Sequence, residues 1–493
     1  MKNKNEIGFP NNFLTKKKSK KSSKDQRMQI EKTNNQYEEF LLSPGQLVED
    51  GNLSRFLCSN LKELYCLMAE KKSDPGENIF IGAHPISMNR TNIDNIIKDD
   101  FLVCEKTDGI RYFLLILNNG KAFLHGRNLV KSKDNQFKQE LQFFSANLKL
   151  PVNFNETGAE LKIKYIFDGE LILDSYENKT LIKFLIFDTI IFEYTRTFGR
   201  DYYDRLEASR RFLSFLKMSK RMIKSNQNIA VKYLPLENES HKIKLSLKDF
   251  FLKEDCEFLF NDYFNKLPHK QDGLIFTKNQ TPYKPGRNDD ILKWKDASQQ
   301  TIDFLLINNQ KFNNPKNYEG QFANKILDLY LIGYNKEFNT SERVLFDFML
   351  VDEEKYNFVS QEIEKLQSNS DAAVCGIIAE CKFNKNLDNS FLKNIYYASP
   401  AKFTEILLKS GIFRQGDSQK YMQVFEENMQ YYVSSKFRGG WEIYGWRHDK
   451  SDPNAFDTGL SIMNGIRDPI DKQDLISMTR KIPGEHPQKK KKV

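Results

Sequence analysis

Five short segments place charged residues beside glycine or at the end of an apolar run, and they limit how the chain can fold. They are KTDGIR (106–111), DGEL (168–171), DGLI (272–275), LKWK (292–295) and RHDK (447–450). A single Asp-Gly pair is typical of a turn. Turns do not explain the whole set, because a charge in apolar surroundings is costly to bury without a partner. The fold must therefore bring these segments together.

The apolar pattern around the segments predicts a mixed α+β chain. Strands are predicted at 110–117, 121–124, 165–173, 181–192, 272–278, 291–296 and 301–307. Helical spacing predicts helices at 53–68, 202–218, 400–411, 419–435 and 471–481. Asn118-Asn119-Gly120 lies between the first two strands and predicts a hairpin, because Asn-Gly supplies the positive φ of a tight turn.

With 493 residues, the chain is long enough for two or three domains. Changes in composition predict a disordered basic tail (1–36), a first domain (37–305), a second domain (306–482) with a helical insertion (384–440), and a basic C-terminal tail (483–493). In the insertion, Tyr421, Met422, Phe425 and Met429 recur at helical spacing. This stripe favours a core face over a partner interface.

The net charge of +9 suits a nucleic-acid or nucleotide partner. Part of it lies in the basic runs 16–21 and 489–492, which predict import into the nucleus, the alternative being solvated tails. The six cysteines form no CxxC pair, which argues against a zinc site or a disulfide framework. No apolar run is long enough to cross a membrane, so a membrane partner is not expected.

The charged segments contain the groups that phosphoryl or nucleotidyl transfer requires. Carboxylates that could supply oxygen ligands to Mg²⁺ or Mn²⁺ are Asp168, Glu170 and Asp272. Lys293 and Lys295 are two residues apart on a predicted strand, so they project to one face and could bind one phosphate. Further positive charge comes from Arg111, Arg447 and Lys450.

Lys106 is the candidate nucleophile. A lysine amine is protonated at neutral pH and then cannot attack phosphorus. Nearby cations and desolvation both favour the neutral amine, and Arg111, Lys293 and Lys295 could supply those cations. A neutral amine can form a covalent lysyl–nucleotide.

In this order, the segments resemble the covalent nucleotidyltransferase superfamily of mRNA capping guanylyltransferases and ATP-dependent ligases. FIGAHPISMNRTNI (80–93), LIFD (185–188) and RHDK resemble capping guanylyltransferase motifs, the last being absent from most DNA ligases. The resemblance runs from about 45 to 470. It implies an α+β nucleotidyltransferase domain of ATP-grasp-like, DNA-ligase type with antiparallel sheets. An OB-fold β-barrel lid, carrying the helical insertion, would follow.

The same resemblance implies roles for individual residues. Lys106 would accept GMP. Nucleotide contacts would come from Thr107, Arg111, Arg127, Glu170, Phe187, Lys232, Lys293, Lys295, Arg447, Asp449 and Lys450. Within this set, Phe187 would stack on guanine and Lys232 would read its edge. Asp272, with Glu170, would hold the metal.

The remaining roles concern the ribose and the phosphates. Arg111 and Arg127 would contact the ribose, although Gly126 stands where the family has aspartate before the second arginine. Lys293 and Lys295 would bind the α-phosphate. The β- and γ-phosphates would be oriented from the second domain by Arg447, Asp449 and Lys450.

The implied activity is transfer of GMP from GTP, through lysyl-GMP, to a 5′-diphosphate RNA end to form the GpppN cap. A separate RNA triphosphatase and the phosphorylated tail of RNA polymerase II would be partners, since the chain has no HCxxxxxR phosphatase signature. One alternative is an ATP-dependent RNA or DNA ligase that uses lysyl-AMP. Another is a non-catalytic RNA-binding scaffold of the same fold.

Overall fold

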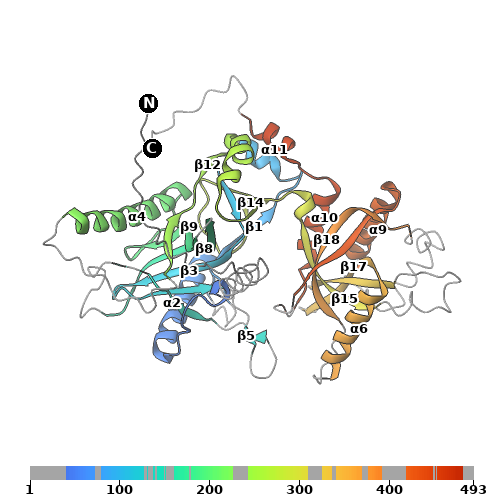
Figure 1. Cartoon of the computed structure of the whole chain (residues 1–493), viewed down its shortest axis with the longest axis horizontal. Helices are drawn as coiled ribbons and strands as arrows, with labels where there is room; N and C mark the ends of the chain where they lie inside the picture. The colour runs from blue at the N-terminus through green and yellow to red at the C-terminus, as the bar shows by residue number, and fades with distance from the viewer. Residues whose placement is uncertain are drawn as a thin grey trace, which may run out of the picture.

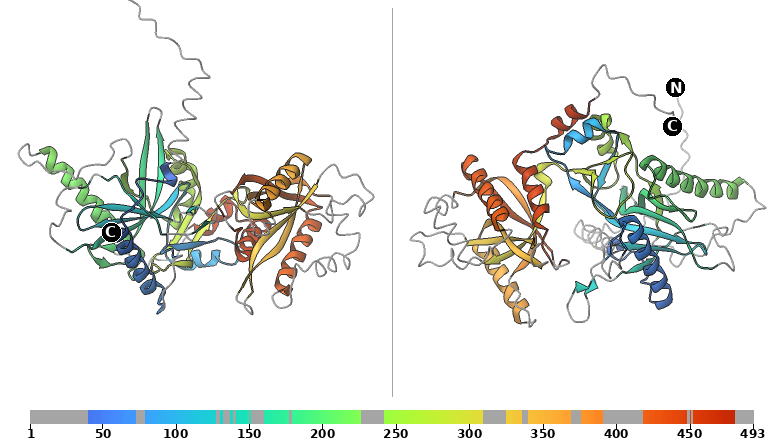
Figure 2. Two further views of the ribbon diagram at one scale, coloured as in Figure 1. Left: turned by 90° about the horizontal axis from the view of Figure 1, so that it is seen from below. Right: turned by 180° about the vertical axis from the view of Figure 1, so that it is seen from behind.

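The computed structural model describes residues 40–72, 79–126, 130–131, 137–138, 141–148, 150, 160–176, 179–225, 242–308, 325–335, 340–368, 376–390, 418–447, 450 and 452–480. They form two lobes, with strands β1 to β14 in the first and β15 to β19 in the second (Figure 1). Figure 2 shows the same two lobes from below and from behind. Among the helices of these ranges, none has the length and apolar character needed to cross a membrane.

The larger sheet of the first lobe is mainly antiparallel and lies between two helices. Its strands run in the order β10-β9-β8-β3-β4-β7, and β11 pairs with β9 in parallel. Their bounds are β3 Ile110–Leu117, β4 Ala122–Gly126, β7 Phe143–Ser145, β8 Ile163–Tyr176, β9 Lys179–Phe192, β10 Thr195–Arg196 and β11 Lys244–Leu247. The antiparallel pairing of β3 with β4 confirms the predicted hairpin, and Gly120 in its turn has φ +79°.

Alternating side chains of β3 explain how this sheet is covered on both faces. Phe113 and Leu115 pack with α2 (Gly51–Ala69). Leu114 and its same-face neighbours pack with α4 (Tyr202–Ser225). Because successive strand residues point to opposite faces, one apolar run fills both cores. Figure 1 shows the two helices on opposite sides of the sheet.

The second sheet of the first lobe carries three of the five charged segments. Its order is β1-β14-β13-β2-β12. The bounds are β1 Ala83–Ser87, β2 Phe101–Thr107, β12 Phe251–Leu252, β13 Gln271–Lys278 and β14 Gly286–Trp294. Short elements nearby are α3 Ile93–Lys98, η3 Lys253–Asp255, α5 Cys256–Phe258, η4 Leu259–Tyr263 and η5 Phe264–Lys266, while β5 Val130–Lys131 and β6 Phe137–Lys138 pair separately.

The second lobe is built on a five-stranded antiparallel sheet of order β17-β16-β15-β18-β19. Its elements, preceded by η6 Ala297–Gln299, are β15 Thr301–Asn308, β16 Lys325–Asn335, β17 Thr340–Val351, α6 Glu353–Ser368, β18 Ile377–Asp388, α9 Ser418–Ser434, β19 Arg438–Trp446 and α10 Phe456–Arg467. The edge strands β17 and β19 lie against each other, so the sheet curls toward a barrel. This arrangement agrees with the predicted barrel that follows an α+β domain.

The insertion contains the predicted helix at 419–435, observed as α9. Tyr421, Phe425 and Met429 are buried in the core of the second lobe, which confirms the core interpretation for these three side chains. The side chain of Met422 and the predicted helix at 400–411 lie outside the described residues.

Two chain segments differ from the predicted domain division. The predicted boundary at 305 falls inside β15, which pairs with β16 and β18 and so belongs wholly to the second lobe. The helix predicted at 471–481 is present as α11 (Lys472–Thr479), but it packs on the first lobe beside α3. Trp294 Nε1 donates to the Ile470 carbonyl at 2.8 Å and helps to fix this segment. Local periodicity predicted the helix but could not show which core it joins.

Candidate active site

Lys106 and Asp272 are brought together by the pairing of β2 with β13. The register of this pair shifts between Gln271 and Leu274, which leaves Asp272 and Gly273 in a bulge. Gly273 has φ +148°, and a Cβ there would lie 2.0 Å from the Trp294 carbonyl oxygen, so only glycine fits. The bulge turns Asp272 toward Lys106, whose Nζ lies 2.6 Å from Asp272 Oδ1.

Three lysines converge on this carboxylate. Asp272 Oδ2 forms an ion pair with Lys295, so each of its oxygens contacts one amine. Lys293 lies on β14, and Lys295 directly follows the end of that strand. Burial, together with the charges of Lys106 and Lys295, lowers the pKa of Lys293 to about 8, while Asp272 opposes the shift. The crowding of lysines expected from the sequence is therefore present in the fold, whereas Arg111, the other expected cation, pairs with Asp168.

Arg111 on β3 forms an ion pair with the buried Asp168 on the neighbouring strand β8 of the larger sheet. Its Nε and Nη2 donate to the two carboxylate oxygens at 2.9 and 2.5 Å, and its Nη1 donates to the Ala83 carbonyl at 2.6 Å. The Tyr283 hydroxyl donates to the same carboxylate. Asp168 has no exposed surface. The interpretation of Asp168 as a metal ligand is therefore wrong, because its oxygens are enclosed and paired.

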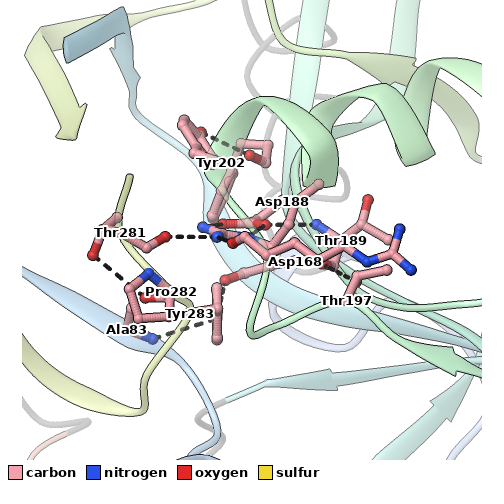
Figure 3. A network of polar contacts seen from close by, with 12 residues as sticks. Ala83, Asp168, Asp188, Thr189, Thr197, Tyr202, Thr281, Pro282 and Tyr283 are labelled. Carbon is pink, nitrogen blue, oxygen red and sulfur yellow. Dashed lines mark hydrogen bonds and ion pairs between the residues drawn. The ribbon is translucent and has the colours of Figure 1, made fainter. Parts of the chain in front are cut away.

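A second buried pair holds the strand that carries Phe187. Arg205 Nε donates to Asp188 Oδ1 at 2.7 Å, and the Tyr202 hydroxyl donates to the Phe187 carbonyl at 2.8 Å. Figure 3 shows Asp188 and Asp168 in one polar network with Tyr202 and Tyr283. Through the Tyr202 hydroxyl, this network holds the Phe187 backbone in place.

A cavity of about 210 Å³ opens beside Lys106. Its lining includes Thr107, Arg111, Glu170, Phe187, Lys248, Cys104, Thr277 and Tyr202. Two cations lie over the Phe187 ring, with Arg111 Cζ 5.4 Å and Lys248 Nζ 5.6 Å from its centroid. An aromatic face beside hydrogen-bond donors is the arrangement that a nucleotide base requires.

Lys248 is the site residue that sequence reasoning missed. It is buried, and its Nζ lies 3.3 Å from Glu170 Oε2. Burial opposes its charged form, but the neighbouring Glu170, Cys104 and Glu105 outweigh burial and raise the pKa of Lys248. Lys248 directly follows β11, whose sequence Lys-Leu-Ser-Leu alternates polar and apolar residues, so it lacks the continuous apolar run that precedes Lys106. No glycine accompanies it, so the segment did not stand out.

Residues 52–297 match the family model described as mRNA capping enzyme, catalytic domain, and residues 299–476 match the model of the C-terminal domain. The chain belongs to the mRNA capping enzyme family. The alpha subunit of the Schizosaccharomyces pombe mRNA-capping enzyme is 26% identical over 80% of this chain and 79% of that protein. The Mus musculus mRNA-capping enzyme is 24% identical over 80% of this chain and 49% of its own length.

Other members of the capping enzyme family match over shorter spans. The alignment with the Candida glabrata alpha subunit, at 29% identity, covers 54% of this chain and 55% of that protein. The chain thus spans about half the length of several relatives it matches. Among solved structures, the Chlorella virus DNA ligase-adenylate has a TM-score of 0.25 and 12% identity over 62% of this chain and 95% of its own.

Two residues of the capping family motif, Arg447 and Lys450, are described, and they follow β19 in the second lobe. Arg447 Nη1 lies 3.2 Å from Asp303 Oδ1, and Lys450 forms an ion pair with Asp303 Oδ2. Glu380 lies 3.9 Å from Arg447. No residue of the second lobe is among the described residues that line the cavity. Arg127, Lys232 and Asp449, the other predicted nucleotide contacts, lie outside the described residues.

Capping enzymes require a divalent metal, and two predicted ligands are present in the first lobe. In the ranges that the structure covers, no group of three or more His, Cys, Asp or Glu side chains is placed to hold a metal by itself. Mg²⁺ is usually bound by one or two carboxylates together with substrate phosphates. Asp272 and Glu170 fit that mode. Both now contact lysines, so an incoming metal would take over oxygens from Lys106, Lys295 or Lys248.

Proposed function

We propose that this chain is an mRNA guanylyltransferase that uses Lys106 to carry GMP from GTP to a 5′-diphosphate RNA end. The observation that carries the proposal is the position of the Lys106 amine, on a cavity lined by Phe187 and Lys248 and 2.6 Å from Asp272. Membership of the capping enzyme family supports the same activity.

The base would occupy the cavity against the face of Phe187. Lys248 can only donate hydrogen bonds. Guanine offers its O6 and N7 as acceptors, whereas adenine places a donor amino group at the corresponding edge. Lys248 therefore favours guanine, and we transfer to it the base-reading role predicted for Lys232. One carboxylate oxygen of Glu170 accepts a hydrogen bond from Lys248, and the other accepts one from the Gly109 N–H at 3.2 Å.

The first step forms a nitrogen–phosphorus bond. The neutral Lys106 amine attacks the α-phosphorus, the bond to the β-phosphate oxygen breaks, and pyrophosphate leaves with the electron pair. Asp272 Oδ1 lies close enough to accept a proton from the amine. Lys293 and Lys295, beside Asp272, would hold the α-phosphate. A divalent metal bound by Asp272 and Glu170 would neutralise phosphate charge.

The second lobe would contribute cations to the leaving pyrophosphate. Arg447 and Lys450 would exchange Asp303 for the β- and γ-phosphates when the lobes close. After pyrophosphate leaves and the lobes open, an oxygen of the RNA β-phosphate attacks the lysyl-GMP phosphorus. The nitrogen–phosphorus bond breaks, Lys106 recovers a proton, and GpppN-capped RNA is released.

Labelling tests the proposal directly. Purified protein with a divalent metal should become labelled by α-³²P-GTP and should pass the label to 5′-diphosphate RNA. Parallel labelling with α-³²P-ATP separates capping from ligation. Label from ATP alone, with sealing of nicked strands, would support a ligase. No covalent label from either nucleotide would support a scaffold.

We also propose a nuclear location and two partners. The basic runs at 16–21 and 489–492 support nuclear import, although both lie outside the described residues. A separate RNA triphosphatase would supply the diphosphate end, and the phosphorylated polymerase tail would deliver the transcript. A fusion to a fluorescent protein should concentrate in the nucleus and lose this location when both runs are changed to glutamine. Co-purification from nuclear extract tests the two partners.

A further inference from the structure

Tyr444 is an aromatic residue that the fold holds out into solvent. Its side chain is 68% exposed, although it lies within β19, between the buried Trp441 and the half-buried Trp446. The register of β18 with β19 explains this position. Cys381 faces Ile443 and Glu380 faces Gly445, so Tyr444 is the extra residue of a β-bulge. A bulge turns a side chain away from the regular pleat, and bulges are frequent beside active sites.

A cation and open space lie next to the Tyr444 ring. Lys382, on the neighbouring strand β18, places its Nζ 5.8 Å from the ring centroid. A Cβ built on Gly445 would meet no atom within 4 Å apart from its chain neighbours, so the backbone next to Tyr444 is open with respect to the other described residues. The ring therefore has room for a planar group, with positive charge beside it.

The same face of the second lobe carries the phosphate-binding cations of the proposed function. In the sheet register, Glu380 lies opposite Gly445 on one side and Asp303 on the other. Asp303 holds Arg447 and Lys450. In Figure 1, β15 and β18 lie on the side of the second lobe that faces the first. Tyr444 thus lies three residues along the chain from the cation that would meet the triphosphate.

We propose that Tyr444 and Lys382 form the binding subsite for the RNA acceptor, with the first transcribed bases stacked on the Tyr444 ring and Lys382 at their backbone. The inference rests on the proposed function and extends it from the donor nucleotide to the acceptor. Single-stranded nucleic acid is commonly bound by aromatic rings flanked by cations, and such stacking tolerates any base. A capping enzyme must accept transcripts of many sequences, which suits stacking better than reading of base edges.

The competing occupant of this surface is the first lobe itself, which could cover Tyr444 when the lobes close. The two alternatives act at different steps. Formation of lysyl-GMP requires closure but no RNA, whereas transfer requires RNA. A variant that affects only transfer therefore identifies an RNA subsite, and a variant that affects labelling identifies a closure contact.

The experiment compares Tyr444→Ala with Tyr444→Phe in the full-length protein, and each step is measured separately. Tyr444→Ala should form lysyl-GMP from GTP at the wild-type rate. Single-turnover transfer from preformed lysyl-GMP to a 5′-diphosphate oligoribonucleotide should require about tenfold more RNA for half-maximal rate. Tyr444→Phe keeps the ring and should behave as wild type. Lys382→Gln should weaken transfer less and should reduce its salt dependence by about one unit of slope.

Each other outcome has a defined meaning. Wild-type RNA dependence of transfer by Tyr444→Ala would overturn the subsite, and slower labelling by that variant would show a closure contact instead. An unchanged thermal melt, expected because the side chain is exposed, excludes misfolding as the cause of a defect. If the wild-type protein forms no lysyl-GMP, the proposed function itself fails, and this result does not depend on any Tyr444 variant.

Discussion

In each lobe one carboxylate binds two cations, and the two sites differ in their balance of positive and negative charge. In the first lobe, Asp272 binds Lys106 and Lys295 beside a third lysine whose pKa is lowered to about 8. In the second lobe, Asp303 binds Arg447 and Lys450. The first site is crowded with positive charge and opens beside the cavity. The second is neutralised by its own carboxylates.

The difference suggests a division of work between the lobes. The crowded site favours binding of the α-phosphate, since phosphate oxygens would relieve repulsion among its lysines. At the neutralised site, phosphates must first compete with Asp303, whose side chain is only 8% exposed. Changes at the first site should therefore affect the covalent step more strongly than changes at the second.

The largest effect short of removing the nucleophile is expected from Asp272→Ala. It removes the group that positions the Lys106 amine and accepts its proton, so the rate of lysyl-GMP formation should fall about 10²–10⁴-fold. Asp272→Asn keeps the size but not the charge and should show most of the loss. Rapid-quench labelling measures the rate. A labelling rate within a few-fold of wild type would remove Asp272 from the chemistry.

A smaller loss is expected from Arg447→Ala. The variant should bind GTP but form lysyl-GMP about 10²-fold more slowly, because a cation at the leaving pyrophosphate is lost. Transfer from lysyl-GMP formed in advance should be unchanged, because pyrophosphate has already left. Arg447→Lys should recover part of the rate. A defect confined to transfer would reverse the division of work between the two carboxylate sites.

Lys248→Met should lower discrimination between GTP and ATP. Loss of a buried hydrogen-bond donor to guanine should reduce the preference by about tenfold, with little change for ATP. The ratio of kcat/KM values for labelling by the two nucleotides measures this preference. Lys248→Arg, which keeps the charge, is the matched control. An unchanged ratio would show that another group reads the base.

The smallest effect concerns stability. The pKa of Lys293 falls from 10.5 to about 8 on folding. Below pH 8 the charged amine therefore destabilises the folded protein relative to the unfolded chain. Lys293→Met should therefore raise the free energy of unfolding by up to about 3 kcal/mol at pH 7. The gain should shrink as pH rises above 8 and vanish above about 10.5. Urea unfolding at several pH values tests this. A lower free energy of unfolding for Lys293→Met than for wild type at pH 7 would contradict the crowding of positive charges at this site.

The sequence predicted most strands and the gathering of Lys293 and Lys295 near Lys106, because these depend on local alternation; the contact of Lys106 with Asp272 came only from the structure. It missed Lys248, and it offered Asp168 as a possible metal ligand. Both errors have one cause, because local pattern does not show which charged side chain finds a buried partner. The return of α11 to the first lobe was missed for a similar reason. Its apolar residues fit either core, and only long-range packing selects one.

The position of the covalent bond tests the central claim most directly. After labelling with α-³²P-GTP, proteolysis and mass spectrometry should locate a single acid-labile GMP on Lys106, and Lys106→Arg should carry no label while melting at the wild-type temperature. Label on another residue, or labelling of Lys106→Arg, would contradict the account.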